Sequence, residues 1–383
     1  MPRDRAIAHR VASLRPSATV EMTEKVRAAK AAGRRILSLA SGDPNIPTDP
    51  RIIEAAHSAL KAGDTRYGPV LGDPKLRSAL AAHEQRRSGA QYDEADVIIT
   101  PGGKFALLTA LMGIVEPGAE VLVPEPGWVS YGPCVELCAG KPVVLPMLDR
   151  IDLPALEAAI TERTVAVIVN SPVNPTGRVI TQKEIDGLVD LARRHKLWIV
   201  FDQVYSDLVH DASFPTPQGT PKGRAFTFVV DSFSKTFGMT GWRLGYLAVP
   251  PGLSKPISRF IQHSIYCVPG AVQAAGLRAL QIYDEVVPGY REMFRRRQRD
   301  AAARLDAVPG VKCAAPNASF YLFPSVATED RALAARWLDQ HDVATVPGSA
   351  FGSTGSGHLR LTVTASDKEI DEALSRIAAA GIA

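Results

Sequence analysis

The stretch Asp-Ser-Phe-Ser-Lys-Thr-Phe-Gly-Met-Thr-Gly-Trp-Arg, residues 231–243, decides the fold and the chemistry of this chain. It follows the continuous apolar run Thr227–Val230, which predicts a buried strand. Lys235 stands just beyond the end of that strand, where desolvation disfavours the charged amine and lowers its pKa. A neutral amine can form a Schiff base with an aldehyde, although most lysines lie in exposed loops. Partner groups elsewhere in the chain must therefore distinguish the two interpretations.

Similar apolar segments recur on both sides of this stretch, separated by helical patterns. They are Val97–Thr100, Glu120–Val123, Pro142–Leu145, Val165–Val169, Trp198–Phe201, Thr227–Val230 and Gly245–Val249. Continuous apolar strands that alternate with helices indicate a mainly parallel sheet covered on both faces. The sequence therefore predicts an α/β fold with a seven-stranded, mainly parallel sheet.

The two ends of the chain do not show this alternation of apolar strands and helices. An arm and an amphipathic helix, Thr19–Ala32, precede the sheet region, and a long helical region follows it, interrupted at Pro288-Gly289. Two further strands and a closing helix from Asp367 indicate a smaller α+β domain. We expect a large domain at residues 45–287 and a small domain made of residues 1–44 and 288–383, with the strands at 319–323 and 359–363.

Composition excludes several classes of function. The 44 basic and 40 acidic residues are dispersed, which argues against nucleic acid as a partner. No apolar stretch reaches membrane-spanning length, and residues 1–6 do not begin a secretory signal. The four cysteines, Cys134, Cys138, Cys267 and Cys313, show neither metal-ligand spacing nor a disulfide framework. A reduced cytoplasm is the expected location, with no metal.

Polar residues follow several strands at the edge where open parallel sheets bind ligands. Gly103 and Lys104 open an apolar helix, whose free backbone N–H groups can hold a phosphate, although most Gly-Gly turns are only turns. Asp202 ends a buried strand and needs a cationic partner there. Trp128, beside a Pro-Gly turn, is by itself more typical of core packing.

Two motifs carry a family resemblance. Asn174-Pro-Thr-Gly and the pattern Ser232-x-x-Lys…Gly-x-Arg243 resemble those of class I/II aminotransferases, which have the pyridoxal 5'-phosphate (PLP)-dependent transferase fold type I. The resemblance extends over residues 17–366 and is nearest to the bacterial aspartate/prephenate aminotransferase branch. It implies that Lys235 holds PLP as a Schiff base and acts as base and acid in a ping-pong transamination.

The resemblance also implies roles around the cofactor. Asn174 and Tyr205 match the residues that bond the phenolic oxygen, Asp202 the partner of the pyridinium nitrogen, and Trp128 the aromatic that stacks on the ring. The expected phosphate contacts are Gly103, Lys104, Ser232, Arg243 and, from a neighbouring subunit, Tyr67. A tyrosine shared in that way implies a homodimer with shared active sites.

Substrate roles follow from the same family. Arg360 matches the arginine that binds the substrate α-carboxylate in a bidentate manner, and the backbone of Gly42 and the side chain of Asn174 lie beside the substrate. Lys104, helped by hydroxyls of residues 16–19, matches the group that meets a distal carboxylate. The predicted substrates are therefore an L-amino acid and a 2-oxo acid, with aspartate or glutamate slightly favoured as donor.

Other functions remain open at this stage. Lys104 can instead point to solvent, with a neutral, aromatic or basic donor. C–S β-lyases and cyclopropane-forming synthases share the fold and cofactor, and a non-enzymatic regulator is a further alternative. Two departures from the family are visible: Gln203-Val204 replaces Glu-Ile, and Cys267-Val-Pro replaces Ser-Asn-Pro, so a phosphate contact at Cys267 is doubtful. That cysteine is more typical of a small buried residue than of a nucleophile.

Overall fold

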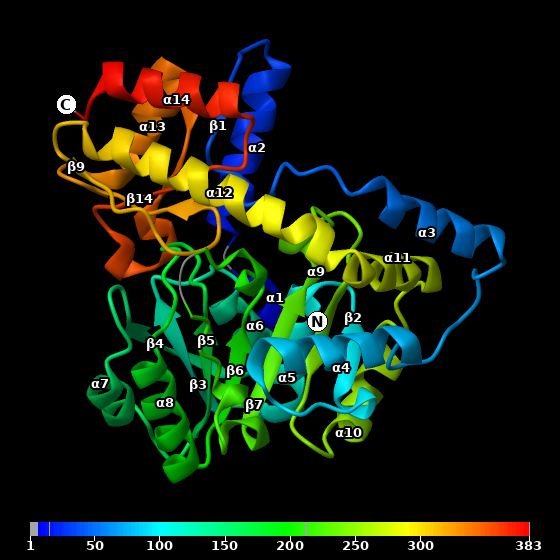
Figure 1. Cartoon of the computed structure of the whole chain (residues 1–383). Coiled ribbons are helices and arrows are strands. Elements are labelled where there is room, and N and C mark those ends of the chain that lie inside the picture. Colours follow the sequence, from blue (N-terminus) through cyan, green and yellow to red (C-terminus); the bar gives the residue numbers. More distant parts are fainter. Residues whose placement is uncertain (1–6, 15, 211–212, 383) are drawn as a thin grey trace, which may run out of the picture.

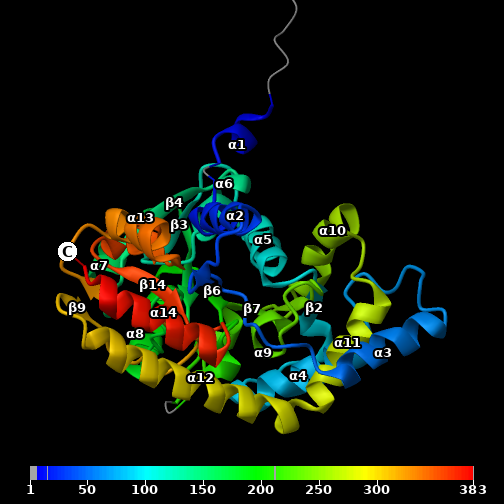
Figure 2. The ribbon, with the colours of Figure 1, turned by 90° about the horizontal axis from the view of Figure 1, so that it is seen from above.

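A computed structural model describes residues 7–14, 16–210 and 213–382 of the chain (Figures 1 and 2). The part of the predicted arm at residues 1–6 lies outside these ranges. Among the described residues, no helix is both long enough and apolar enough to cross a membrane.

The seven-stranded sheet is present, and each predicted strand falls within two residues of its expected limits. The strands are β2 (Val97–Thr100), β3 (Glu120–Glu125), β4 (Lys141–Pro146), β5 (Thr164–Asn170), β6 (Trp198–Asp202), β7 (Thr227–Ser232) and β8 (Gly245–Ala248), in the order β2-β8-β7-β6-β5-β3-β4. β8 is antiparallel to both of its neighbours, β2 and β7, and the other strand pairs of this sheet are parallel. The predicted fold class is therefore confirmed.

Helices cover both faces of the sheet (Figure 1). Successive residues of β7 point to opposite faces: Phe228 and Val230 pack in the core beside α5, whereas Val229 packs in the core with α4 and α11. This double burial explains why the strands are continuous apolar runs rather than alternating ones. The helices are α3 (Pro50–Lys61), α4 (Pro74–Ser88), α5 (Gly103–Ile114), α6 (Tyr131–Leu137), α7 (Leu153–Ala158), α8 (Gln182–His195), α9 (Phe233–Thr236), α10 (Ser254–Ser264) and α11 (Gly270–Gln281).

The chain ends build a second layered unit beside the sheet. β1 (Leu37–Ser38) pairs in parallel with β12 (Val343–Ala344), and β14 (Leu359–Thr362) lies between β10 (Tyr321–Leu322) and β13 (Val346–Pro347). A small pair, β9 (Val311–Lys312) and β11 (Ser325–Val326), completes its strands. Its helices are α2 (Ala18–Ala31), α12 (Tyr283–Asp306), α13 (Asp330–His341) and α14 (Asp367–Ala380), whereas α1 (His9–Ala12) contacts α6 of the sheet region. The exact domain limits stay a prediction.

The expected helix break at Pro288-Gly289 is wrong. α11 ends at Gln281, and α12 starts at Tyr283 and runs through Pro288. Because Pro288 lies in the second turn, it removes a single backbone hydrogen bond near the helix start. Val287 and Phe294 are fully buried on one side of this helix, and that packing outweighs the lost bond.

Candidate active site

A cavity of about 400 Å³ opens at the carboxyl ends of the parallel strands, beneath the segments of the second unit. Every residue predicted for the site except Tyr67 lines it: Gly42, Gly103, Lys104, Trp128, Asn174, Asp202, Tyr205, Ser232, Lys235, Arg243 and Arg360. These side chains come from segments more than 300 residues apart in the chain, so the fold itself assembles the site.

Lys235 extends from α9, the short helix that directly follows β7. Its Nζ donates a hydrogen bond to the Gly42 carbonyl oxygen at 2.7 Å. Burial among the cavity walls lowers the pKa of this amine to about 8. A much larger fraction of this amine than of an ordinary lysine is therefore neutral, and nucleophilic, near neutral pH.

Asp202 stands at the end of β6, with only 4% of its surface exposed. The Tyr131 hydroxyl donates to its Oδ2 at 2.8 Å, and the Val204 backbone N–H donates to its Oδ1 at 3.2 Å. Burial raises the pKa of this carboxyl to about 6, against the two hydrogen bonds, which lower it. A cationic group in the cavity would hold it as a carboxylate. Tyr131 was not predicted, although it belongs to the Trp-Val-Ser-Tyr segment that begins at Trp128.

Asn174 and Tyr205 line the same cavity as Asp202, and each is hydrogen-bonded to a further residue. The Asn174 backbone N–H donates to Asn170 Oδ1 at 2.7 Å, and Asn170 Nδ2 donates to the Asp202 carbonyl at 2.9 Å. The Tyr205 hydroxyl meets the Tyr321 hydroxyl at 2.7 Å. Tyr321 was missed because a tyrosine in a short apolar strand is most simply explained as core.

One end of the cavity is built for an anion. Gly102 has a φ of +90°, and a Cβ there would lie 2.6 Å from Arg243 Nη2, so only glycine permits this approach. Arg243 bonds the carbonyls of Thr240 and Pro101, and Ser232 caps α9 by accepting from the Ser234 N–H at 3.1 Å. Together with the first N–H groups of α5, these donors form a cradle of positive potential.

Arg360 approaches the cavity from β14, with 2% of its surface exposed. Its Nη2 donates to the Ala40 carbonyl at 2.6 Å, and its guanidinium lies 4.9 Å from the Tyr321 ring and 4.8 Å from the Phe351 ring. Its buried Nε has no hydrogen-bond partner. A buried guanidinium with no carboxylate partner is unusual, and the cavity is where such a partner can bind.

Trp128 and Lys104 form the outer wall. The Trp128 ring packs edge-on against Tyr131 at 5.5 Å, and Lys104 Nζ lies 5.1 Å from the centre of the Trp128 ring. Thr19 and Thr23 of α2 also line the cavity. Lys104 is exposed although it lines the cavity.

Tyr67 lies away from the cavity. It is 84% exposed, and its ring contacts Tyr266 at 4.8 Å beside a surface hollow that Cys267 also lines. Within one subunit, therefore, Tyr67 does not reach the site. Among the described residues, no group of three or more histidine, cysteine or acidic side chains is arranged to hold a metal.

Comparison with known proteins identifies the family. The model described as aminotransferase class I and II matches residues 34–377. The chain is a class I/II aminotransferase. This transaminase is 36% identical to the aspartate aminotransferase of Geobacillus stearothermophilus, over 97% of this chain and 98% of that protein. It is also 36% identical to the aspartate/prephenate aminotransferase of Cereibacter sphaeroides, over 96% and 97%.

Solved structures agree on the fold of this aminotransferase. It superposes on the aspartate aminotransferase from Thermus thermophilus with maleate at a TM-score of 0.93, with 34% identity over 98% of this chain and 99% of that one. The aromatic aminotransferase of Pyrococcus horikoshii gives a TM-score of 0.87, with 32% identity over 93% and 98%. The predicted family and fold type I are thereby confirmed.

Proposed function

We propose that this aminotransferase uses PLP and moves an amino group from an acidic L-amino acid to a 2-oxo acid by a ping-pong mechanism. The observation that carries the proposal is the convergence of three groups on one cavity: the Lys235 amine, the Asp202 carboxylate and the Arg360 guanidinium. Each answers a different part of the chemistry: covalent attachment, charge on the cofactor ring, and recognition of the substrate carboxylate.

The donors in the cavity fit PLP. The glycine turn at Gly102, the hydroxyl of Ser232 and the guanidinium of Arg243 match a phosphate dianion. Asp202 is the buried acid that a protonated pyridine nitrogen would neutralise, and Tyr205 and Asn174 offer hydrogen bonds to a phenolic oxygen. Bound in this way, PLP supplies an electron sink for the electrons left at the substrate α-carbon.

The protein residues then have distinct tasks. Lys235 Nζ is the proton carrier, because its lowered pKa leaves it neutral often enough to accept the α-proton and acidic enough to return it. Arg360 fixes the α-carboxylate, and with it the direction in which the Cα–H bond points. The Asp202 carboxylate, held by Tyr131 and the Val204 N–H, keeps a proton on the pyridine nitrogen.

An acidic donor is favoured by the outer wall of the cavity. The Lys104 ammonium lies over the Trp128 ring, and Thr19 and Thr23 line the same cavity. The relatives named above include two that are named for aspartate, and the Thermus thermophilus structure contains maleate. These names also disfavour the C–S lyase alternative. The aromatic aminotransferase of the same fold keeps an aromatic donor as the second candidate.

Replacing Lys104 with alanine should raise the KM for aspartate and glutamate roughly tenfold, because one charge-assisted hydrogen bond to the distal carboxylate is lost. The KM for alanine or phenylalanine should stay nearly constant, because these donors have no distal carboxylate. Steady-state kinetics with both donor classes on the same preparation measure the difference. An equal rise in the KM for the neutral donors would show that Lys104 does not bind the side chain of the substrate.

The cofactor-free protein should take up PLP faster as the pH rises toward about 8, and the rate should level off above that. The neutral amine is the reacting form, and burial places the pKa of Lys235 at about 8. Stopped-flow absorbance over a pH series gives the profile. A rate that still climbs to pH 10 would indicate a lysine with the ordinary pKa of about 10.4.

The expected assembly is a homodimer in the cytoplasm, with Tyr67 of each subunit reaching the phosphate of the other. The exposure of Tyr67 outside its own cavity supports this assignment, because a tyrosine so exposed has room to enter a partner. Replacing Tyr67 with phenylalanine in a mixed dimer with Lys235→Ala subunits would reveal whether the two positions act across the interface.

An absorbance spectrum tests the proposed function most directly. The purified protein should have a band near the visible edge, and titration with L-aspartate should convert it to a pyridoxamine band more effectively than L-phenylalanine or L-arginine. Failure to develop any band after PLP is added would overturn the proposal. Preferential conversion by L-phenylalanine would establish the aromatic donor instead.

A further inference from the structure

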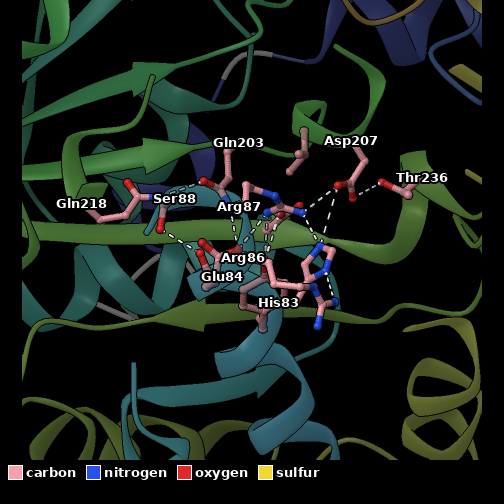
Figure 3. A network of polar contacts seen from close by, with 12 residues as sticks. His83, Glu84, Arg86, Arg87, Ser88, Gln203, Asp207, Gln218 and Thr236 are labelled. Atoms are coloured by element: carbon pink, nitrogen blue, oxygen red, sulfur yellow. Dashed lines mark hydrogen bonds and ion pairs between the residues drawn. The ribbon is translucent and has the colours of Figure 1, made fainter. Parts of the chain in front are cut away.

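A buried polar network lies directly behind the active site, and its centre is Arg87 of α4 (Figure 3). Arg87 Nη1 donates to Glu84 Oε1 at 2.8 Å and to Asp231 Oδ2 at 2.6 Å. Its Nη2 donates to Asp207 Oδ1 at 2.9 Å and to His83 Nε2 at 2.7 Å. Only 9% of the Arg87 side chain is exposed. The mechanism proposed above assigns no task to any of these groups.

Two branches of the network end beside the lysine segment. Asp231, at the end of β7, accepts the backbone N–H of Ser232 on its Oδ1 at 2.6 Å. Asp207 Oδ2 accepts from Thr236 Oγ1 at 3.0 Å, and Thr236 is the residue after Lys235. The two carboxylates that Arg87 holds therefore fix both the start and the end of the turn that carries Lys235.

A third branch ends beside Asp202. Gln203, the next residue of the chain, donates from Nε2 to Glu84 Oε1 at 2.8 Å and to Asp231 Oδ2 at 3.2 Å. Its Oε1 accepts from Gln218 Nε2 at 3.0 Å. Glu84 Oε1 and Asp231 Oδ2 thus accept from both Arg87 and Gln203. Because Gln203 directly follows Asp202, these bonds also restrain the backbone at Asp202. The segments that carry Lys235 and Asp202 are therefore connected through Arg87 by hydrogen bonds outside the cavity.

The charges of the network explain why residue 203 is an amide. One guanidinium faces three buried carboxyl groups, those of Glu84, Asp207 and Asp231. Burial acts to raise the pKa of Asp207, but the Arg87 charge, the His83 imidazole and the Tyr283 hydroxyl together outweigh burial and hold that pKa well below its usual value. Burial raises the pKa of Asp231. A glutamate at position 203 would add a fourth carboxyl to one cation, whereas the glutamine amide donates to two of the acids.

We propose that Arg87 is a positioning residue for transamination, which holds the Lys235 turn and the end of the Asp202 strand in fixed relative positions. In this arrangement residue 203 must be an amide rather than an acid, because Asp231 already supplies the carboxyl group on that side. The inference rests on the proposed function. It concerns side chains that touch neither substrate nor cofactor, so it is tested by what their loss does to the site rather than to the fold.

Arg77 offers a matched control for Arg87. It lies on the same helix, is 8% exposed, and bonds Glu94 Oε1 at 2.9 Å and the Val97 carbonyl at 2.9 Å, at the end of β2 away from the cavity. Both Arg87→Met and Arg77→Met should lower the melting temperature, because each leaves a buried acceptor unpaired. Only Arg87→Met should lower kcat, by roughly 100-fold with KM little changed, and weaken PLP binding to the cofactor-free protein.

The comparison is made on holoenzymes, well below both melting temperatures, with PLP dissociation constants measured separately on the cofactor-free proteins. Equal kcat and equal PLP affinity in the two variants would overturn the positioning role. A wild-type enzyme that neither binds PLP nor transaminates would instead overturn the proposed function, and the inference with it.

A charge exchange keeps the proposal testable should Arg87→Met fail to fold. Gln203→Glu should lower kcat and PLP affinity, because it adds a carboxyl group to the network. Combining it with Asp231→Asn restores the original number of carboxyl groups and returns an N–H···O contact between positions 203 and 231. The double variant should therefore exceed Gln203→Glu in both quantities. If the effects of Gln203→Glu and Asp231→Asn on kcat and PLP affinity simply add in the double variant, the two residues do not share a network.

Discussion

Replacing Lys235 with alanine is expected to abolish transamination, with a loss of at least about 10⁴-fold in kcat. A positioned general base alone contributes up to about 10⁴-fold, and Lys235 is also the proposed attachment point of the cofactor. Its amine lines the same cavity as Asp202 and Arg360, and the charges of both groups act on it. Single-turnover absorbance measurements with L-aspartate report the loss independently of product release.

The control for this variant is Lys104→Ala, which removes the other lysine of the cavity wall. That variant should retain turnover with neutral donors. Lys235→Ala should still bind PLP through the phosphate cradle and Asp202, with unchanged circular dichroism. Persistent turnover in a well-folded Lys235→Ala protein would mean that another group moves the α-proton.

Replacing Arg360 with methionine should reduce kcat/KM for every amino acid at least about 100-fold, which corresponds to about 2.7 kcal/mol. The guanidinium is buried, and its Nε has no hydrogen-bond partner among the described residues. Methionine retains part of the packing against Tyr321 and Phe351 but offers no donor. Steady-state kinetics over a donor series give the effect.

Arg360→Lys separates charge from geometry. An ammonium keeps the charge but cannot form two parallel hydrogen bonds to a carboxylate, so its kcat/KM should lie between those of the methionine variant and the wild type. Amines without an α-carboxylate should react equally poorly with all three proteins. A methionine variant as active as the wild type would remove Arg360 from substrate recognition.

The sequence predicted the sheet and most of the cavity because both depend on local signals. Each strand is a continuous apolar run, and residues such as Asp202 and Ser232 follow directly at the strand ends, where parallel topology collects them. The break near residue 288 was misplaced because proline is a local signal too, and the burial of Val287 and Phe294 overrode it.

The Arg87 network could not be found in this way. His83, Glu84 and Arg87 lie in a helical stretch rich in charge, which is typical of a solvated surface. Their burial depends on Asp207 and Asp231, which lie 120 and 144 residues further along the chain. Only the fold brings these acids to the guanidinium. Tyr131 and Tyr321 were missed for the same reason, since their hydroxyl partners are distant in sequence.

The pairing of β1 with β12 also has a consequence for biosynthesis. Leu37 leaves the ribosome roughly 300 residues before its partner Val343, a delay of about 15 to 60 s at a synthesis rate of ~5–20 residues per second. During that time, Leu37 and Leu39 lack the core in which the finished protein buries them. The nascent chain therefore has an apolar segment that chaperones can bind, and Arg360 can join Lys235 at the cavity only after the 125 residues from Lys235 to Arg360 have been synthesised.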